Sequence, residues 1–86
     1  MFHVYVIRSQ TTKRLYTGYT TDLTQRVGQH NHAITRSTKN RGPWILVYSE
    51  SYTTRAEAMR RERFLKSGRG REEVKHLLAA SGSFGD

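Results

Sequence analysis

The stretch "RLYTGYTTDLTQRVGQH", residues 14–30, decides the fold because its pattern changes from strand to helix just after a glycine. Its first part, residues 15–20, is rich in aromatic and β-branched side chains, which is typical of a β-strand. Gly18 interrupts this strand, which indicates a kink or a point where another group must approach the backbone closely. The following "TTD" offers N-cap side chains, so residues 22–32 are predicted to form a short polar helix.

The flanking residues are predicted to complete a three-stranded sheet. Residues 3–9, which include the run "VYVI", form the first strand of a hairpin with residues 15–20, across the short polar loop 10–14. Residues 44–52, "WILVYSESY", are predicted to form the third strand. Because the first half of this strand is continuously apolar, we expect it to be the central, buried one.

Two helices are predicted after the third strand. Thr54 and Glu57 have the spacing of a capping box at the start of a helix that runs to about residue 67. The segment "SGRG" is expected to break this helix at Gly68, and residues 71–80 are predicted to form the last helix. The predicted fold class is α+β, a small three-stranded antiparallel sheet flanked by helices in the order β-β-α-β-α-α.

The chain carries a strong excess of positive charge. Its 86 residues include 15 Lys+Arg against 7 Asp+Glu, a formal net charge of +8. A domain this basic usually binds a polyanion, and nucleic acid is favoured over a basic surface that is merely solvated. An acidic membrane is disfavoured because the basic residues do not share a helix with an aromatic, lipid-seeking face. No obligate protein partner is inferred.

Composition also excludes several classes of site. The chain contains no cysteine, which excludes disulfides and cysteine-based zinc sites. No apolar run approaches the ~20 residues that a membrane-spanning helix needs, and the N-terminus is too polar for a signal peptide. We therefore expect a cytoplasmic protein with a single domain, residues 1–80, and a flexible tail, residues 81–86.

Four side chains of the first half of the chain can meet at one site. Tyr5 and Tyr16 lie on the two strands of the predicted hairpin, at neighbouring positions. Arg26 and His30 are four residues apart on the predicted helix and share a face. Arginine is suited to binding phosphate, and histidine can exchange protons near neutral pH. The alternatives are that the tyrosines are ordinary strand residues and that the helix face is only solvated.

Glu62 is the most informative acidic position. Its helical neighbours Ala58, Met59 and Leu65 form the apolar stripe of the helix. A carboxylate in such a stripe is costly unless it is paired or bound to a metal. Either a metal site or an ion pair with a basic side chain of the same helix is therefore expected.

Taken together, these residues resemble the signature of the GIY-YIG nuclease superfamily. The resemblance rests on "VYV" at residues 4–6, "YTG" at residues 16–18, Arg26 and His30 in R-x-x-x-H, and Glu62 in "AMRRERFLK". The order of elements also agrees with that family. "RGPWILVY" and the small size resemble its single-domain bacterial branch, whose role is mostly unassigned.

The resemblance implies a metal-dependent endonuclease that hydrolyses phosphodiester bonds, with DNA favoured as substrate. It implies one Mg²⁺, or Mn²⁺, per site, held by Glu62. A single carboxylate can bind a Mg²⁺ that keeps several waters and takes phosphate oxygens as further ligands. The implied catalytic residues are Tyr5, Tyr16, Arg26, His30 and Glu62.

The roles of the other residues follow as a hypothesis from the resemblance. Arg26 stabilises the charge on the phosphate in the transition state. Tyr16 takes the proton from the attacking water, and His30 orients Tyr16 or relays that proton. Tyr5 holds the water or the phosphate, and Gly18 allows the backbone near the site.

Three basic residues outside the motifs, Arg36, Lys39 and Arg41, are expected to contact backbone phosphates. The chain departs from the family pattern in two places. Val4 replaces the outer glycine of the first motif, and no asparagine follows Asn40, although several nucleases of the superfamily carry one near the end of the domain.

Two alternatives to a nuclease stay open. The first is a nucleic-acid-binding module that keeps the fold and is catalytically inactive. The missing late asparagine and the small size favour it. The second is a structural subunit of a ribonucleoprotein.

Overall fold

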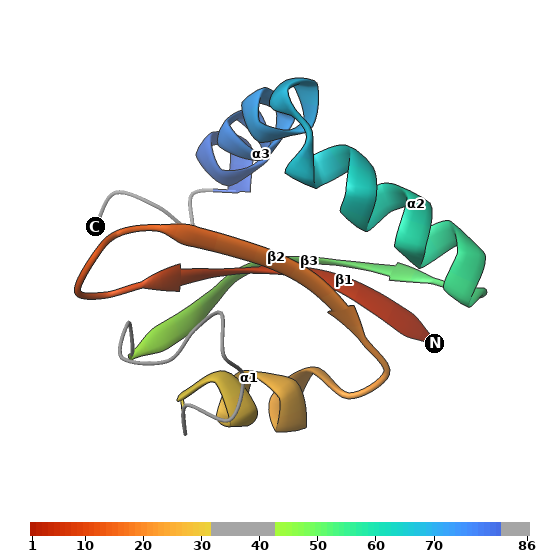
Figure 1. The fold of residues 1–86 in the computed structure, drawn as a ribbon, viewed down its shortest axis with the longest axis horizontal. Coiled ribbons are helices and arrows are strands. Elements are labelled where there is room, and N and C mark those ends of the chain that lie inside the picture. The colour runs from red at the N-terminus through yellow and green to blue at the C-terminus, as the bar shows by residue number, and fades with distance from the viewer. Residues whose placement is uncertain (32–42, 82–86) are drawn as a thin grey trace.

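A computed structural model describes residues 1–31 and 43–81 of the chain. It has an α+β fold whose elements follow the predicted order β-β-α-β-α-α (Figure 1). The elements are β1 (Phe2–Ser9), β2 (Leu15–Thr20), α1 (Leu23–Asn31), β3 (Trp44–Tyr52), α2 (Arg55–Lys66) and α3 (Gly68–Ser81). The predicted fold class is confirmed.

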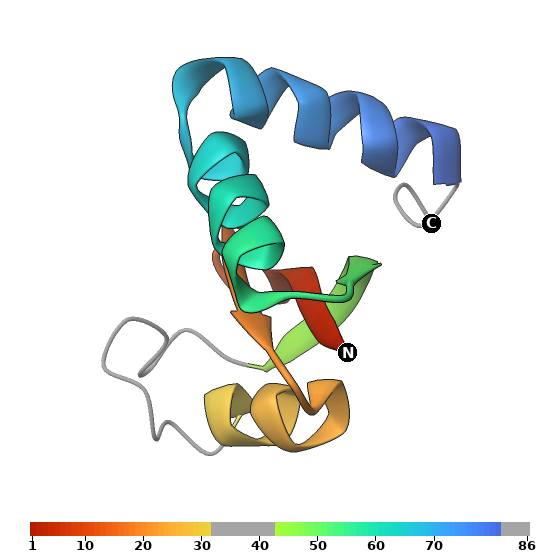
Figure 2. The ribbon, with the colours of Figure 1, turned by 90° about the vertical axis from the view of Figure 1, so that its right-hand side faces the viewer.

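The three strands form one antiparallel sheet in the order β2-β1-β3. Helix α1 lies on one face of this sheet, and α2 and α3 lie on the other (Figures 1 and 2). The prediction that β3 is the central strand is therefore wrong. Strand β3 is an edge strand, and its apolar residues Ile45 and Leu46 are 39% and 43% exposed. The central strand is β1, whose consecutive residues 4–7 are all buried because helices cover both faces of the sheet.

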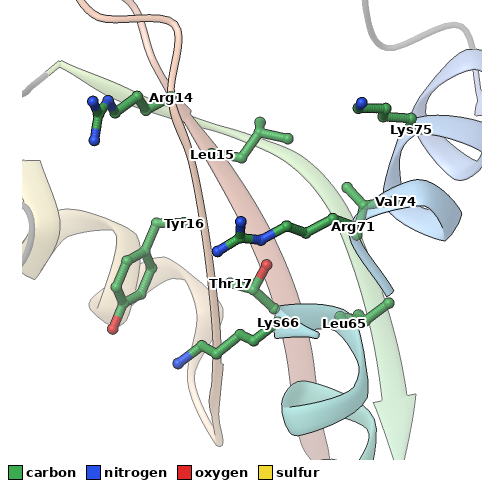
Figure 3. A pocket seen from close by; sticks show the side chains of 9 residues that line it. All are labelled: Arg14, Leu15, Tyr16, Thr17, Leu65, Lys66, Arg71, Val74 and Lys75. Atoms are coloured by element: carbon green, nitrogen blue, oxygen red, sulfur yellow. The ribbon is translucent and has the colours of Figure 1, made fainter. Parts of the chain in front are cut away.

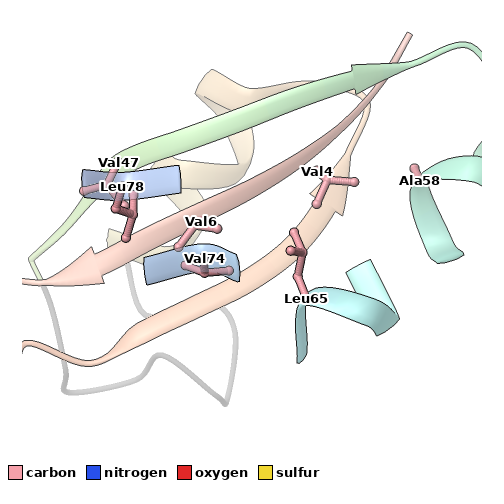
Figure 4. Close-up of a cluster of buried hydrophobic side chains, with 7 residues drawn as sticks. All are labelled: Val4, Val6, Val47, Ala58, Leu65, Val74 and Leu78. Atoms are coloured by element: carbon pink, nitrogen blue, oxygen red, sulfur yellow. The ribbon is translucent and has the colours of Figure 1, made fainter. Parts of the chain in front are cut away.

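The two faces of β1 bury different kinds of side chain. Val4 and Val6 point into an aliphatic cluster with Val47 of β3 and with side chains of α2 and α3 (Figure 4). The α2 and α3 members of this cluster are Ala58, Leu65, Val74 and Leu78. Tyr5 and Ile7 point to the opposite face, where they pack with Trp44 beneath α1. Because successive side chains of β1 point to opposite faces of the sheet, this strand separates an aliphatic core from an aromatic one.

An ionic network joins β3, α2 and α3. Both carboxylate oxygens of Glu50 accept hydrogen bonds from Arg61, at 2.9 and 3.0 Å, and one from each hydroxyl of Tyr48 and Tyr52, at 2.6 Å. Arg61 also donates to Glu73 of α3 at 2.8 Å. Burial alone would raise the pKa of Glu50, but the bonds from Arg61 and the two tyrosines hold it below its ordinary value. The network fixes the position of α2 over the sheet.

The junction between α2 and α3 is tighter than the sequence predicted. The segment "SGRG" was expected to end a helix at Gly68 and leave a gap, but only Ser67 is extended and α3 begins at Gly68. The Ser67 hydroxyl accepts a hydrogen bond from the backbone N–H of Gly70 at 3.2 Å, as an N-cap does. A Cβ atom at position 70 would lie 1.8 Å from the carbonyl oxygen of Phe64, so only glycine allows this close approach of the two helices.

Substitution of Gly70 tests this junction. Gly70→Ala is expected to lower the free energy of unfolding by about 2 kcal/mol or more, because the new methyl group collides with backbone atoms of α2. Gly68→Ala is the matched control, since a Cβ there meets nothing within 4 Å. The control is expected to be neutral or to stabilise by up to about 1 kcal/mol. Urea unfolding of both variants measures this, and equal effects would contradict the close approach.

Some predictions concern residues outside the described part of the chain. Helix α3 extends through Ser81, and the predicted flexible tail otherwise falls on residues 82–86, so it stays a prediction. Within the described residues, none of the helices has the length and apolar character needed to cross a membrane.

Candidate functional site

The predicted site residues of the hairpin lie on the face of the sheet that α1 covers. In the register of the hairpin Tyr5 pairs with Gly18 and Ile7 pairs with Tyr16, so the two tyrosines lie diagonally on one face. A Cβ atom at position 18 would lie 2.6 Å from the Tyr5 hydroxyl oxygen. Gly18 lies within the continuous strand β2 and makes room for the side chain of Tyr5, which crosses over this neighbouring strand.

Helix α1 supplies the hydrogen-bond partners of this tyrosine. The Tyr5 hydroxyl lies 2.9 Å from Nε2 of His30, and Nε of Arg26 donates to the same hydroxyl at 3.4 Å. Because the arginine can only donate, the simplest arrangement has Tyr5 donating its proton to His30. Both Tyr5 and His30 are 1% exposed. Arg26 and His30, which are four residues apart on α1, thus both hydrogen-bond to the hydroxyl of Tyr5.

The burial of this pair keeps both partners neutral near pH 7. Burial, and then the positive charge of Arg26, lower the pKa of His30 to about 4. Burial also raises the pKa of Tyr5, although the hydrogen bond from Arg26 acts in the opposite direction. The negative charges of nearby groups, including Glu62, raise it further. A neutral phenol hydrogen-bonded to a neutral imidazole is therefore the resting state.

The low pKa of His30 predicts a loss of stability in acid. The unfolded chain takes up this proton near pH 6.5 and the folded chain only near pH 4, so the folded state is penalised as the pH falls between these values. The free energy of unfolding is expected to drop by up to about 3 kcal/mol over this window through His30. His30→Gln removes this dependence, and His76→Gln, at an exposed position on α3, is the control.

The measurement is urea unfolding of the three proteins at several pH values, together with an NMR titration of the histidine rings. A His30 ring that titrates near pH 6.5 in the folded protein, or equal pH profiles for both variants, would contradict the buried neutral pair.

Tyr16 lies between α1 and the end of α2. Its ring centre is 4.9 Å from that of His30 and 6.5 Å from that of Trp44. The ammonium of Lys66, in the last turn of α2, lies 5.6 Å from the same ring centre. Tyr16 is only partly buried, and its hydroxyl makes no hydrogen bond to the described residues. Of the two tyrosines, Tyr16 is the one whose hydroxyl is available to a bound molecule.

Glu62 reaches this region from α2. Its side chain is 18% exposed and its Oε2 lies 3.4 Å from Nζ of Lys66. The expected ion pair with a basic residue of the same helix is thus present. Lys66 is 48% exposed, and an exposed pair of this kind contributes little stability. The carboxylate can therefore exchange this partner for another cation at small cost.

The donor set fits a divalent cation held through water. Within residues 1–31 and 43–81, no group of three or more His, Asp or Glu side chains is arranged to enclose a metal ion. Glu62 alone would supply one carboxylate oxygen, and a hard, hydrated cation such as Mg²⁺ accepts such a site when substrate phosphate completes its shell. The residues present fit a metal that binds together with substrate, and they do not form a closed protein cage.

Two residues of α1 that the sequence analysis did not single out support the site. Oε1 of Gln29 accepts a hydrogen bond from Nη1 of Arg26 at 2.9 Å, which fixes the guanidinium on the site side of the helix. The amide of Asn31 donates to the carbonyl of Trp44 at 3.0 Å and accepts from its N–H, so it binds the first residue of β3 as a neighbouring strand would. The i, i+3 spacing of Arg26 and Gln29 could have predicted their contact from the sequence. The contact between Asn31 and Trp44 could not be predicted, because it depends on the tertiary structure.

The comparison with known proteins agrees with this geometry. The sequence profile of the GIY-YIG catalytic domain matches residues 1–75. The chain belongs to the GIY-YIG family. This places it in a nuclease superfamily whose members generally depend on a divalent metal.

Relatives in the GIY-YIG family cover nearly the whole chain. A UPF0213 protein of Staphylococcus haemolyticus is 38% identical over 76 residues, which span 87% of this chain and 92% of the relative. A UPF0213 protein of Halobacterium salinarum is 45% identical over 67 residues, 77% of this chain and 86% of the relative. The solution NMR structure of a UPF0213 protein from Bacillus halodurans is 34% identical, has a TM-score of 0.54, and is matched over 90% of this chain and 85% of that chain.

The departure from the GIY-YIG pattern at Val4 has a structural reason. Val4 is fully buried in the aliphatic cluster beneath α2 and α3, where a glycine would leave a void. The predicted phosphate-binding residues Arg36, Lys39 and Arg41 lie outside the described residues, so their role stays a prediction.

Proposed function

We propose that this GIY-YIG protein is a metal-dependent endonuclease that hydrolyses phosphodiester bonds of nucleic acid, with DNA as the favoured substrate. One observation carries the proposal. Tyr5, Tyr16, Arg26 and His30, which come from three separate elements, contact one another on one face of the sheet, and Lys66, the partner of Glu62, lies against the Tyr16 ring. The strongly positive chain supports a polyanionic substrate.

The metal belongs at Glu62. A Mg²⁺ or Mn²⁺ bound there, one per site, would supply Lewis-acid stabilisation of the leaving oxygen. Glu62 would hold it, and its present partner Lys66 would then be able to add positive charge near the phosphate.

Arg26 and Tyr16 act on the phosphate and the water. The guanidinium of Arg26 uses two of its nitrogens on Tyr5 and Gln29, which leaves further N–H groups to stabilise charge on a phosphate oxygen. In its phenolate form, which Arg26 or the metal has to favour, Tyr16 takes the proton from the attacking water and becomes a neutral phenol. Lys66, beside the Tyr16 ring, supplies a positive charge that favours this transfer.

Tyr5 and His30 hold this arrangement in place. The sequence-based hypothesis had Tyr5 on the water or phosphate and His30 acting on Tyr16. Because the Tyr5 hydroxyl is buried and bonded to His30 and Arg26, both residues act instead as positioning residues for the arginine. Their contacts limit the guanidinium to one orientation, which is what charge stabilisation in a transition state requires.

Cleavage assays test the proposal. Plasmid, linear, branched and single-stranded substrates are incubated with the protein in Mg²⁺, in Mn²⁺ and in chelator. Glu62→Gln and Tyr16→Phe are each expected to reduce the cleavage rate by about 100-fold or more without loss of binding. Glu72→Gln, an exposed carboxylate of α3, and Tyr19→Phe, on the opposite face of β2, are the matched controls.

The opposite outcome favours the alternative function. Glu62 already has a cationic partner in Lys66, which is compatible with a nucleic-acid-binding module without catalysis. Salt-dependent binding with no cleavage in either metal, or cleavage unchanged in both site variants, overturns the nuclease proposal. Absence of binding to any nucleic acid excludes the binding module as well, and leaves the structural subunit.

A further inference from the structure

A pocket lies at the free edge of β2, beside Tyr16. It has a volume of about 530 Å³ and lies between β2, the end of α2 and the first half of α3 (Figure 3). This volume is in the range of sites that enclose small molecules. Strand β2 forms no pairing on this side because it is an edge strand of the sheet.

The pocket has an apolar floor and a basic rim. Leu15, Leu65 and Val74 supply the aliphatic side chains, and Thr17 lies beside them. The charged lining residues are Arg14, Lys66, Arg71 and Lys75, all of them basic. Figure 3 shows the Arg71 guanidinium and the Lys66 ammonium extending from their helices toward β2. A ligand that suits this lining has a flat or apolar body and negative charge.

Two of the four cations are available for such a ligand. Lys66 is paired with Glu62 at 3.4 Å, and Lys75 with Glu72 at 3.5 Å, in exposed helical pairs. Arg14 and Arg71 form no ion pair with the described residues. Figure 3 shows the Arg71 guanidinium directed toward the recess, whereas that of Arg14 points away from Arg71. An arginine at the rim of a recess can bind phosphate oxygens through several N–H groups at once.

The pocket is continuous with the proposed catalytic site. Tyr16 and Lys66 line it, and the same lysine contacts Glu62. A chain of phosphates that occupied both regions would therefore pass around the edge of β2. The next nucleotide of a bound strand would lie in the pocket.

We propose that this pocket binds an unpaired nucleotide of the substrate strand next to the cleavage site, which makes single-stranded or frayed nucleic acid the preferred substrate class. The proposal rests on the proposed function in taking nucleic acid as the ligand. A paired base is held within its duplex and cannot enter a recess walled by a strand and two helices. An unpaired nucleotide can place its base on the aliphatic floor and its phosphate against Arg71, with Arg14 at the rim available to a neighbouring phosphate of the strand.

Binding measurements in EDTA test this without any catalysis. The probes are fluorescent oligothymidylate, oligouridylate and a DNA duplex of the same length, followed by anisotropy over a range of salt concentrations. The double variant Arg14→Gln/Arg71→Gln is expected to bind both single strands about tenfold more weakly, with a salt dependence smaller by about 1.4 in log–log slope. Its affinity for the duplex is expected to fall less.

Two further variants separate the pocket from general charge. Arg55→Gln/Arg60→Gln removes the same charge from exposed positions in the first turns of α2, and is expected to affect single strands and duplex alike. Leu15→Trp keeps the charge but fills the recess from a position that is 40% exposed. It is expected to weaken binding of the single strands and not of the duplex.

The outcomes distinguish this inference from the proposed function. The inference is overturned if the Arg14/Arg71 variant matches the Arg55/Arg60 control, or if Leu15→Trp leaves single-strand binding unchanged. Loss of single-strand binding in both pocket variants supports it even if the wild-type chain cleaves nothing, a result that would overturn the nuclease proposal alone. If only one of the two probes, DNA or RNA, loses affinity, that probe identifies the strand that the pocket accepts.

Discussion

The hydroxyl of Tyr5 reaches helix α1 only because position 18 has no side chain. The phenol crosses β2 at a distance that any Cβ would block, and its oxygen then bonds to His30 and Arg26. These bonds and the ring contacts of Tyr16 add to the packing of Leu23 and Val27 and so hold this short polar helix on the sheet. The position of the arginine, and with it any phosphate chemistry, follows from this one contact.

The opposite face of the sheet anchors helices α2 and α3. Its aliphatic cluster and the Glu50–Arg61–Glu73 network hold α2 and α3 without contributing to the tyrosine cluster. They set how far the last turn of α2 projects past β2. Glu62 and Lys66 therefore reach around the edge of the sheet to the face where Tyr16 lies. The candidate site is built from both layers, with the edge strand between them.

Strand propensity, helix capping and helical spacing predicted the elements of this fold from short stretches of sequence. The strands, the capping box at Thr54, and the helical spacing of Arg26 and His30 all follow from residue types at short range, and the motif order indicated the family. The position of β3 could not be predicted in the same way. Continuous apolar residues occur in both β1 and β3, and the choice between centre and edge depends on which strand the helices cover.

In the candidate site, too, some features could be predicted from the sequence and others depend on the tertiary structure. The resemblance to the family named the five motif residues, but the hydrogen-bond partner of His30 was expected to be Tyr16 and is Tyr5. That choice depends on the hairpin register and on the space left by Gly18, which are properties of paired strands. Arg14 and Arg71 were not singled out because they line one pocket only when the start of α3 folds over the edge of β2.

The two hydrogen bonds between Asn31 and the backbone of Trp44 close the segment between α1 and β3 at its base. Asn31 and Trp44 are therefore held side by side next to the aromatic residues of the site. Lengthening the chain between two fixed points costs little, about 0.6 kcal/mol for each doubling. A change in the number of residues between Asn31 and Trp44 is therefore expected to leave the phenols and the guanidinium in their places.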